Sequence, residues 1–294
     1  MSNYVIFTDS GCDIKPALLR DWGVDSCSLI FRFNDSDREY TNEDMPVTEF
    51  YQKMRDGGVA KTSAVNVDSF LEAFEAHLGE GRDILYLGFS GGLSTTSNSA
   101  RIAAGELAEK YPERKIFVVD TLCASAGQGL LVKLAVDKKN SGATIEEAAK
   151  FAEDIRPKIA HWFTVDDLVY LKRGGRVSPT VAFVGNTLGI KPILHVDDEG
   201  HLTSVTKARG RKKSIAALVD MYGEMVDSSE NYPIYISHSD SYDDAKAIAD
   251  GIEQKFGAKV ELITDVGPVI GAHSGPGTLA LFFVAKEREK GILQ

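Results

Sequence analysis

Compact apolar runs alternate with longer amphipathic stretches in the first half of the chain. The runs Tyr4–Phe7, Ile84–Phe89 and Lys115–Val119 are short and apolar, which is typical of buried strands. A further strand is expected over Ser26–Phe33. Helices are expected over residues 17–22, 47–55, 67–78, 94–110, 124–138 and 144–159. This alternation predicts a three-layer α/β arrangement, with a mainly parallel sheet and helices on both of its faces.

The pattern changes after about residue 160. A short helix is expected over residues 163–173, followed by a separate segment over residues 178–188. Residues 192–196 and 202–206 flank Asp197-Asp198-Glu199-Gly200, which indicates a hairpin. The remaining expected elements are helices over 212–226 and 243–256 and strands over 233–237, 259–264 and 279–285. Because 294 residues exceed the usual size of one domain, we expect two α/β domains, 1–160 and 161–294.

Polar loops follow several of the expected strands. Thr8-Asp9-Ser10, Ser90–Ser94 and Asp120-Thr121 would share the carboxyl edge of the first sheet, where α/β proteins bind ligands. Near the C-terminus, four glycines and two prolines surround His273 in residues 266–277. Glycine and proline interrupt helices and strands, so we expect a tight loop that presents His273. Together these loops predict one composite site for a small molecule, with an anion as the favoured ligand.

Composition narrows the function classes. The net charge of −10 argues against a nucleic-acid-binding protein. Three cysteines without a C-x-x-C pair, and without histidines at ligand spacing, predict neither a disulfide framework nor a zinc site. Neither a signal peptide nor an apolar run of about 20 residues is present, so we expect a cytoplasmic protein without stable membrane insertion. The chain also contains no G-x-x-x-x-G-K-[ST] loop for ATP.

Gly88-Phe89-Ser90-Gly91-Gly92 fits the G-x-S-x-G pattern after a strand and before a helix. In an α/β-hydrolase this pattern makes the serine a nucleophile, and His273 lies downstream where a catalytic histidine is expected. No acidic partner stands out, however, and the same glycines suit a tight structural turn. A serine hydrolase using Ser90 therefore stays an alternative.

Three other polar segments have a structural and a functional interpretation. Thr62 and Ser63 precede an expected helix, so they either cap it or donate hydrogen bonds to an anion. Arg173 either pairs with Asp167 or borders a binding surface together with Arg176. The basic cluster over residues 207–213 is either a solvated helix start or a docking patch for phosphate or an acidic partner.

Taken together, these segments resemble the DegV family. The resemblance runs through most of the chain, and its segments are Thr8-Asp9-Ser10, Lys61-Thr62-Ser63, Ser90-Gly91-Gly92-Leu93-Ser94, Val119-Asp120-Thr121, Ala124–Gly129, Val165–Leu168, Leu171–Arg176, Leu188–Pro192 and His273–Gly277. It implies two α/β domains that enclose a long-chain fatty acid. Thr95-Thr96-Ser97 and Cys123 depart from the commoner family pattern, which could alter the acyl chain that fits.

The resemblance also implies a function. Several members are the fatty-acid-binding subunits (FakB) of bacterial fatty acid kinase, which are not enzymes themselves and present the carboxylate to a separate kinase subunit (FakA-like) for phosphorylation to an acyl phosphate. No cofactor is implied, and ATP would bind the partner. A lipid carrier or sensor without a kinase is a further alternative.

The resemblance also implies roles for individual residues. Thr62 or Ser63, together with Ser94, should hydrogen-bond the carboxylate, with His273 beside it. Arg173, Arg209 and His273 match positions linked to productive engagement of the kinase. A carboxylate close to His273 is expected to favour the protonated imidazole.

Overall fold

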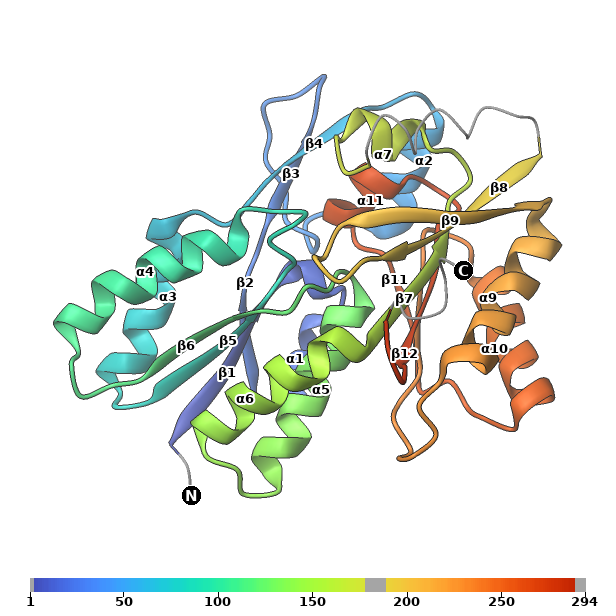
Figure 1. Ribbon diagram of the computed structural model, residues 1–294. Helices are drawn as coiled ribbons and strands as arrows, with labels where there is room; N and C mark the ends of the chain where they lie inside the picture. The colour runs from blue at the N-terminus through green and yellow to red at the C-terminus, as the bar shows by residue number, and fades with distance from the viewer. Residues whose placement is uncertain (1–2, 178–188, 289–294) are drawn as a thin grey trace.

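A computed structural model describes residues 3–177 and 189–288, and contains two large sheets (Figure 1). The first sheet has the order β2-β1-β5-β6, and all its neighbouring strands are parallel. Its strands are β1 (Tyr4–Asp9), β2 (Val24–Cys27), β5 (Asp83–Gly88) and β6 (Ile116–Asp120). The predicted parallel sheet of the N-terminal half is confirmed.

Helices cover both faces of the first sheet. One face carries α3 (Val67–Gly79) and α4 (Thr96–Lys110), whose apolar side chains pack with Val5, Phe7 and Ile84. The other face carries α1 (Pro16–Asp21), α5 (Ala126–Asn140) and α6 (Ile145–Ile155). The short 3-10 turns are η1 (Ser10–Cys12) and η2 (Arg156–Lys158). These layers give the expected three-layer arrangement.

The strand predicted over Ser26–Phe33 is two strands in two different sheets. β2 ends at Cys27, and β3 (Ile30–Phe33) pairs antiparallel with β4 (Ala60–Ser63) in a separate ribbon. The amide of Leu29 between them donates to the Ser10 hydroxyl, which turns the chain. Helix α2 (Val47–Arg55) connects the two strands of this ribbon.

Thr62 and Ser63 consequently lie in a strand. The capping interpretation of these two residues is wrong, because the Asn66 side chain accepts from the Ser69 amide and caps α3. The alternation of side chains along β4 then turns Thr62 and Ser63 to opposite sides, with Thr62 half-buried and Ser63 exposed.

The second sheet is mixed, with the order β11-β10-β12-β7-β8-β9. Its strands are β7 (Ile159–Thr164), β8 (Ile190–Val196), β9 (Leu202–Arg209), β10 (Tyr235–His238), β11 (Leu262–Asp265) and β12 (Leu279–Val284). Only β10 and β11 are parallel neighbours among these strands, and β8 and β9 form the expected hairpin. Helices α9 (Arg211–Met225) and α10 (Tyr242–Phe256) pack on the outer face.

Strand β7 was not expected from the sequence. The predicted helix over 144–159 ends at Ile155, and the predicted helix over 163–173 begins only at Val169, as α7 (Val169–Arg173). All six residues of β7 are buried, since Ala160 and Trp162 pack in the cluster under α9 and α10 while His161 and Phe163 face the interior between the two sheets. Such a strand lacks the alternation of polar and apolar residues that identifies a half-exposed strand. The segment predicted over 178–188 lies outside the described residues.

The glycine-rich segment around His273 also differs from the prediction. Pro268–Ser274 form a short helix, α11, and not a loop. Pro268 stands at the first helical turn, where proline needs no amide partner, and Gly275 ends the helix with a φ of +80°. The prolines and glycines thus set the limits of a helix.

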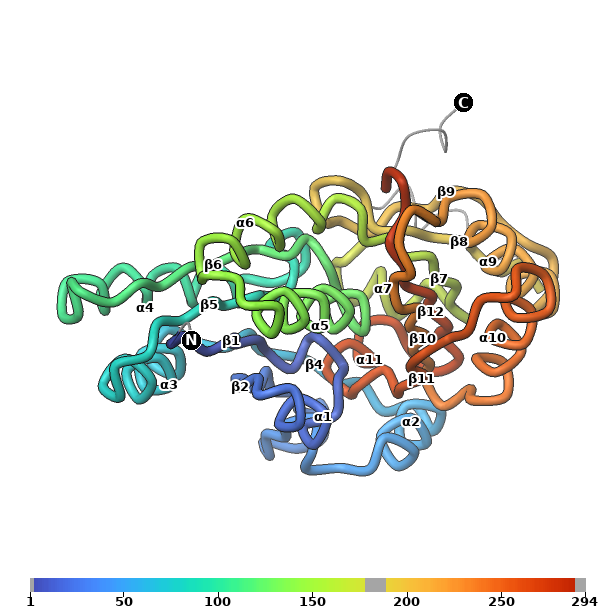
Figure 2. Tube along the Cα trace, turned by 90° about the horizontal axis from the view of Figure 1, so that it is seen from below, coloured from blue at the N-terminus to red at the C-terminus, as the bar shows by residue number. Residues whose placement is uncertain are grey.

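Helix α5 packs on the first sheet and also against strands β7, β10 and β12 of the second (Figures 1 and 2). Val269 and Ala272 of α11 likewise pack in a cluster with Phe31 and Phe50. These contacts hold the two sheets together around a shared space. The division at residue 160 stays a prediction.

Candidate functional site

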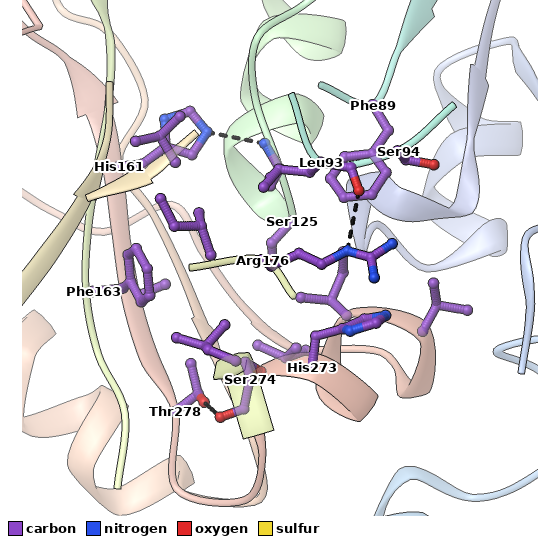
Figure 3. Close-up of a pocket in the computed structure, with 18 of the residues that line it drawn as sticks. Phe89, Leu93, Ser94, Ser125, His161, Phe163, Arg176, His273, Ser274 and Thr278 are labelled. Atoms are coloured by element: carbon purple, nitrogen blue, oxygen red, sulfur yellow. Dashed lines mark hydrogen bonds between the residues drawn. The ribbon is translucent and has the colours of Figure 1, made fainter. Parts of the chain in front are cut away.

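A cavity of about 470 Å³ lies between the first sheet's carboxyl edge and the inner face of the second sheet (Figure 3). Its volume falls in the usual range for small-molecule sites. Apolar side chains from both halves make up most of its wall, namely Leu29, Phe89, Leu93, Phe163, Leu171, Val196, Leu202, Val266, Val269, Ile270, Ala280 and Phe282. A space of this kind suits an apolar ligand with few polar atoms.

The main polar groups of one end are Thr62, Ser94, Arg176 and His273, each from a different element. Thr62 lies on β4, Ser94 precedes α4, Arg176 follows α7 and His273 lies on α11. Figure 3 shows Ser94, Arg176 and His273 on one side of the cavity and His161 and Phe163 on the other. One end of the largely apolar cavity therefore carries a cluster of polar groups that includes a guanidinium.

Thr62 and His273 contact each other directly. The Thr62 Oγ1 and the His273 Nε2 are 2.8 Å apart, although the two residues are 211 positions apart in the chain. Burial, together with repulsion by the nearby Arg176 guanidinium, lowers the pKa of His273 to about 4. The protein alone therefore keeps His273 neutral near pH 7. The protonated imidazole was expected beside a bound carboxylate, and that expectation stays a prediction.

Residues of the first domain hold α11 in place. Asp13 accepts a hydrogen bond from the Gly267 amide (3.0 Å), and Asn42 accepts one from the Val269 amide (3.0 Å). The Tyr51 hydroxyl donates to the Val266 carbonyl at 2.7 Å. The first two bonds satisfy amide groups at the helix start, the third satisfies the Val266 carbonyl, and together they fix the position of the residues that follow, His273 among them.

The loop before α4 is shaped by carboxylates at the strand ends. Asp9 accepts from the Phe89 amide at 2.9 Å, and Asp120 accepts from the Gly91 amide. The Ser94 hydroxyl then lies 2.9 Å from the Thr96 hydroxyl and half-buried at the cavity wall. Thr8-Asp9, Ser90–Ser94 and Asp120-Thr121 do meet at one edge of the sheet, as predicted.

Three predicted site residues do not line the cavity. Ser63 is exposed on the far side of β4 from Thr62. Arg173 is exposed on α7, with its guanidinium 5.8 Å from the centre of the Tyr170 ring. Arg209 is exposed at the end of β9, paired with Ile190. The roles of these residues stay predictions.

Arg176 lies at the same end of the cavity as Thr62, Ser94 and His273, and the sequence analysis left its role open. Its Nε donates to the Leu93 carbonyl at 3.2 Å, and its Nη1 donates to the Gly174 carbonyl. The side chain is half-buried at the cavity wall, and burial lowers its pKa. One signal in the sequence pointed to this region, namely the glycine pair Gly174-Gly175 before Arg176. Gly174 leaves room for the His273 ring, because a Cβ on residue 174 would lie 2.2 Å from the His273 Nδ1.

Ser90 occupies a structural position. Its hydroxyl donates to the Gly200 carbonyl at 2.8 Å and accepts from the Gly92 amide at 3.2 Å, which ties the β8–β9 hairpin to the first domain. His273 is bonded to Thr62 instead. This geometry favours the interpretation of the glycines as a tight turn.

Part of the basic cluster has a structural role as well. Arg211 is bonded to Asp244 (2.8 Å) and lies 3.4 Å from Asp166, which also pairs with Lys191. Arg211 therefore anchors the start of α9.

Residues 3–177 and 189–288 contain no helix with the length and apolar character needed to cross a membrane. The same ranges have no cluster of three His, Cys, Asp or Glu side chains suited to a metal ion.

Comparisons with known proteins agree in one family. The family model described as an uncharacterised protein of the DegV family matches residues 3–286. A DegV domain-containing protein of Clostridium perfringens is 42% identical over 290 residues, which cover 98% of this chain and 100% of the relative. Among solved structures, a DegV lipid-binding protein from Thermotoga maritima has 31% identity and a TM-score of 0.83, covering 98% of this chain and 100% of its own. A fatty-acid-binding DegV family protein from Thermus thermophilus has 30% identity and a TM-score of 0.85, covering 96% and 99%.

Proposed function

The chain belongs to the DegV family, and on this premise we propose that it binds one long-chain fatty acid in the cavity between its two sheets. The observation that carries the proposal is the largely apolar cavity, one end of which is lined by Thr62, Ser94, Arg176 and His273. The acyl tail lies among the apolar side chains, and the carboxylate lies at the end formed by Thr62, Ser94, Arg176 and His273.

The tail supplies most of the affinity. Each buried methylene contributes about 0.8 kcal/mol, so about a dozen of them supply roughly 10 kcal/mol before the costs of ordering the chain. Burial of the carboxylate opposes binding, because the free-energy cost of an unpaired buried charge exceeds the free energy that burial of the tail supplies. Hydroxyl donors and the Arg176 guanidinium at the same end offset that cost.

Thr62, and not Ser63, is the proposed carboxylate donor, because Thr62 lines the cavity. The His273 Nδ1 is buried without a hydrogen-bond partner among the described residues. A buried unpaired N–H is costly, so the proton belongs on Nε2, where it is donated to the Thr62 oxygen. The Thr62 hydroxyl proton is then free to point at the carboxylate.

Ser94→Ala tests the head-group assignment. Loss of a hydrogen bond to a charged group costs about 1.5–3 kcal/mol, so oleate should bind about tenfold to a hundredfold more weakly. Competition against a fluorescent fatty acid measures the change. Ser63→Ala is the matched control and should leave the affinity unchanged; equal effects of the two substitutions would contradict the assignment.

We further propose that the protein presents the bound carboxylate to a FakA-like kinase subunit, which phosphorylates it to an acyl phosphate. The chain has no recognisable ATP loop, so its contribution is to hold and orient one reactant for in-line transfer. Helix α7, with the exposed Arg173, packs against α11, which carries His273. Arg173 thus lies on an element next to the proposed head-group end.

Incubation of oleate with ATP, magnesium and the kinase subunit should give acyl phosphate only when this protein is added. Arg209→Ala should slow phosphorylation while oleate binding stays at the wild-type level, since Arg209 is exposed and outside the cavity wall. Equal product without the protein would reject the presenting role and favour a carrier that acts without a kinase. Loss of oleate binding in the variant would instead assign Arg209 to the binding site.

A further inference from the structure

Two rows of side chains cross the cavity face of the second sheet. The first row contains Phe163, Ala280 and Ser237 in register on β7, β12 and β10. The second row contains His161 and Phe282, paired on β7 and β12. All five residues line the cavity. The rows therefore form its floor.

Ala280 has the smallest side chain in the first row. It lies between Phe163 and Ser237, and its side chain ends at Cβ, so the floor is open at this position. A larger side chain at position 280 would project into the cavity, since alternate residues of a strand face the same side.

The second row lies between the cavity and helix α5. The rings of His161 and Phe282 meet edge to face with centroids 5.2 Å apart. Helix α5 packs directly behind them, because a Cβ on Gly127 would lie 2.2 Å from the His161 Nε2 and 2.7 Å from the Phe282 Cδ1. The backbone of α5 at Gly127 thus lies directly against this pair of rings.

The wall formed by His161 and Phe282 is uncharged although it contains a histidine. The His161 Nδ1 lies 2.9 Å from the Ile159 carbonyl, which can only accept, so Nδ1 carries the proton. Nε2 in turn accepts from the Ala124 amide at 3.2 Å. Burial and the nearby Arg288 lower the pKa of His161 well below its usual value. Both ring nitrogens are satisfied, and the ring surface that remains is suited to a terminal methyl group.

We propose that Ala280 and the His161–Phe282 wall determine which acyl chain lengths the cavity accommodates. The inference rests on the proposed function, with the carboxylate at the Ser94 and His273 side and the chain end at the opposite side, where Figure 3 places His161 and Phe163. Ala280 lets the chain pass across the first row, and the wall stops it at the second.

The test is an affinity series of saturated acids from lauric to arachidic, measured on the full-length protein by competition with a fluorescent fatty acid. Ala280→Leu adds three carbon atoms to the floor and should move the optimum to shorter chains. Each methylene left without space costs about fourfold in affinity, so the ratio of stearate to myristate affinity should fall at least tenfold. Phe282→Leu should move the optimum to longer chains.

Ala160→Leu is the matched control. Ala160 is 1% exposed and lies on the opposite face of the same sheet, so this variant adds the same atoms without touching the cavity. Its length profile should equal that of the wild type. Ala280→Val, with a smaller shift in the same direction, replaces Ala280→Leu if that protein does not fold.

A wild-type profile in both position-280 variants would overturn this role in chain-length selection while leaving fatty acid binding intact. Failure of every acid to bind the wild type would overturn the proposed function, and the inference with it.

Discussion

Arg288→Ala is expected to lower the free energy of unfolding by about 3–5 kcal/mol, because it removes a buried charged donor that serves four carbonyls. The guanidinium donates to Ile159, Leu122 and Asp197 at 3.0 Å each, and to Arg156. The side chain is only 2% exposed. Its acceptors belong to the loop after β6, the link between the two sheets and the β8–β9 turn, so three separate segments lose their shared donor.

Urea unfolding measures this change as a lower midpoint with an unchanged slope. Arg288→Lys keeps the charge but cannot reach all three segments, so it should fall between the alanine variant and the wild type. Arg101→Ala, an exposed arginine on α4, is the control and should change stability by less than about 0.5 kcal/mol. A wild-type midpoint for Arg288→Ala would mean that these segments hold together without it.

Arg176→Ala is expected to weaken oleate binding by about a hundredfold to several thousandfold. Without Arg176 the buried carboxylate loses its cationic neighbour, and breaking a buried charge pair costs about 3–5 kcal/mol. Oleyl alcohol, which carries no charge, should bind wild type and variant with nearly equal affinity. Isothermal titration with both ligands separates the charge effect from a general loss of fit.

Arg173→Ala is the matched control, because Arg173 is three positions away and exposed. It should leave the affinity for oleate unchanged. The variant Arg176→Ala should also raise the pKa of His273 above about 4, since repulsion by Arg176 is one of the two causes that lower it. Equal losses for oleate and oleyl alcohol would contradict an electrostatic role.

The sequence predicts those parts of the fold that local patterns determine. β1, β5 and β6 are short apolar runs followed by polar loops, so both the strands and their common edge were predicted correctly. β7 was missed because burial on both faces erases the alternation that identifies strands. Helix α11 was missed because its proline and glycines were taken as interruptions and not as its limits.

Some features of the site could likewise be predicted from the sequence, and others could not. Thr62, Ser94 and His273 line the cavity, while the carboxylate contacts that the family resemblance implied for them stay a prediction. The choice between Thr62 and Ser63 needed the alternation of side chains along β4, a strand that the sequence analysis did not predict. Arg288 has no local signature, because its acceptors are backbone carbonyls far away in the chain.

Native mass spectrometry of the protein purified directly from cells tests the central claim, that the cavity encloses a fatty acid. We expect the mass of the chain plus one long-chain acid, which organic extraction removes and added oleate restores. A chain that carries no added mass, and takes up no oleate after extraction, would contradict the account.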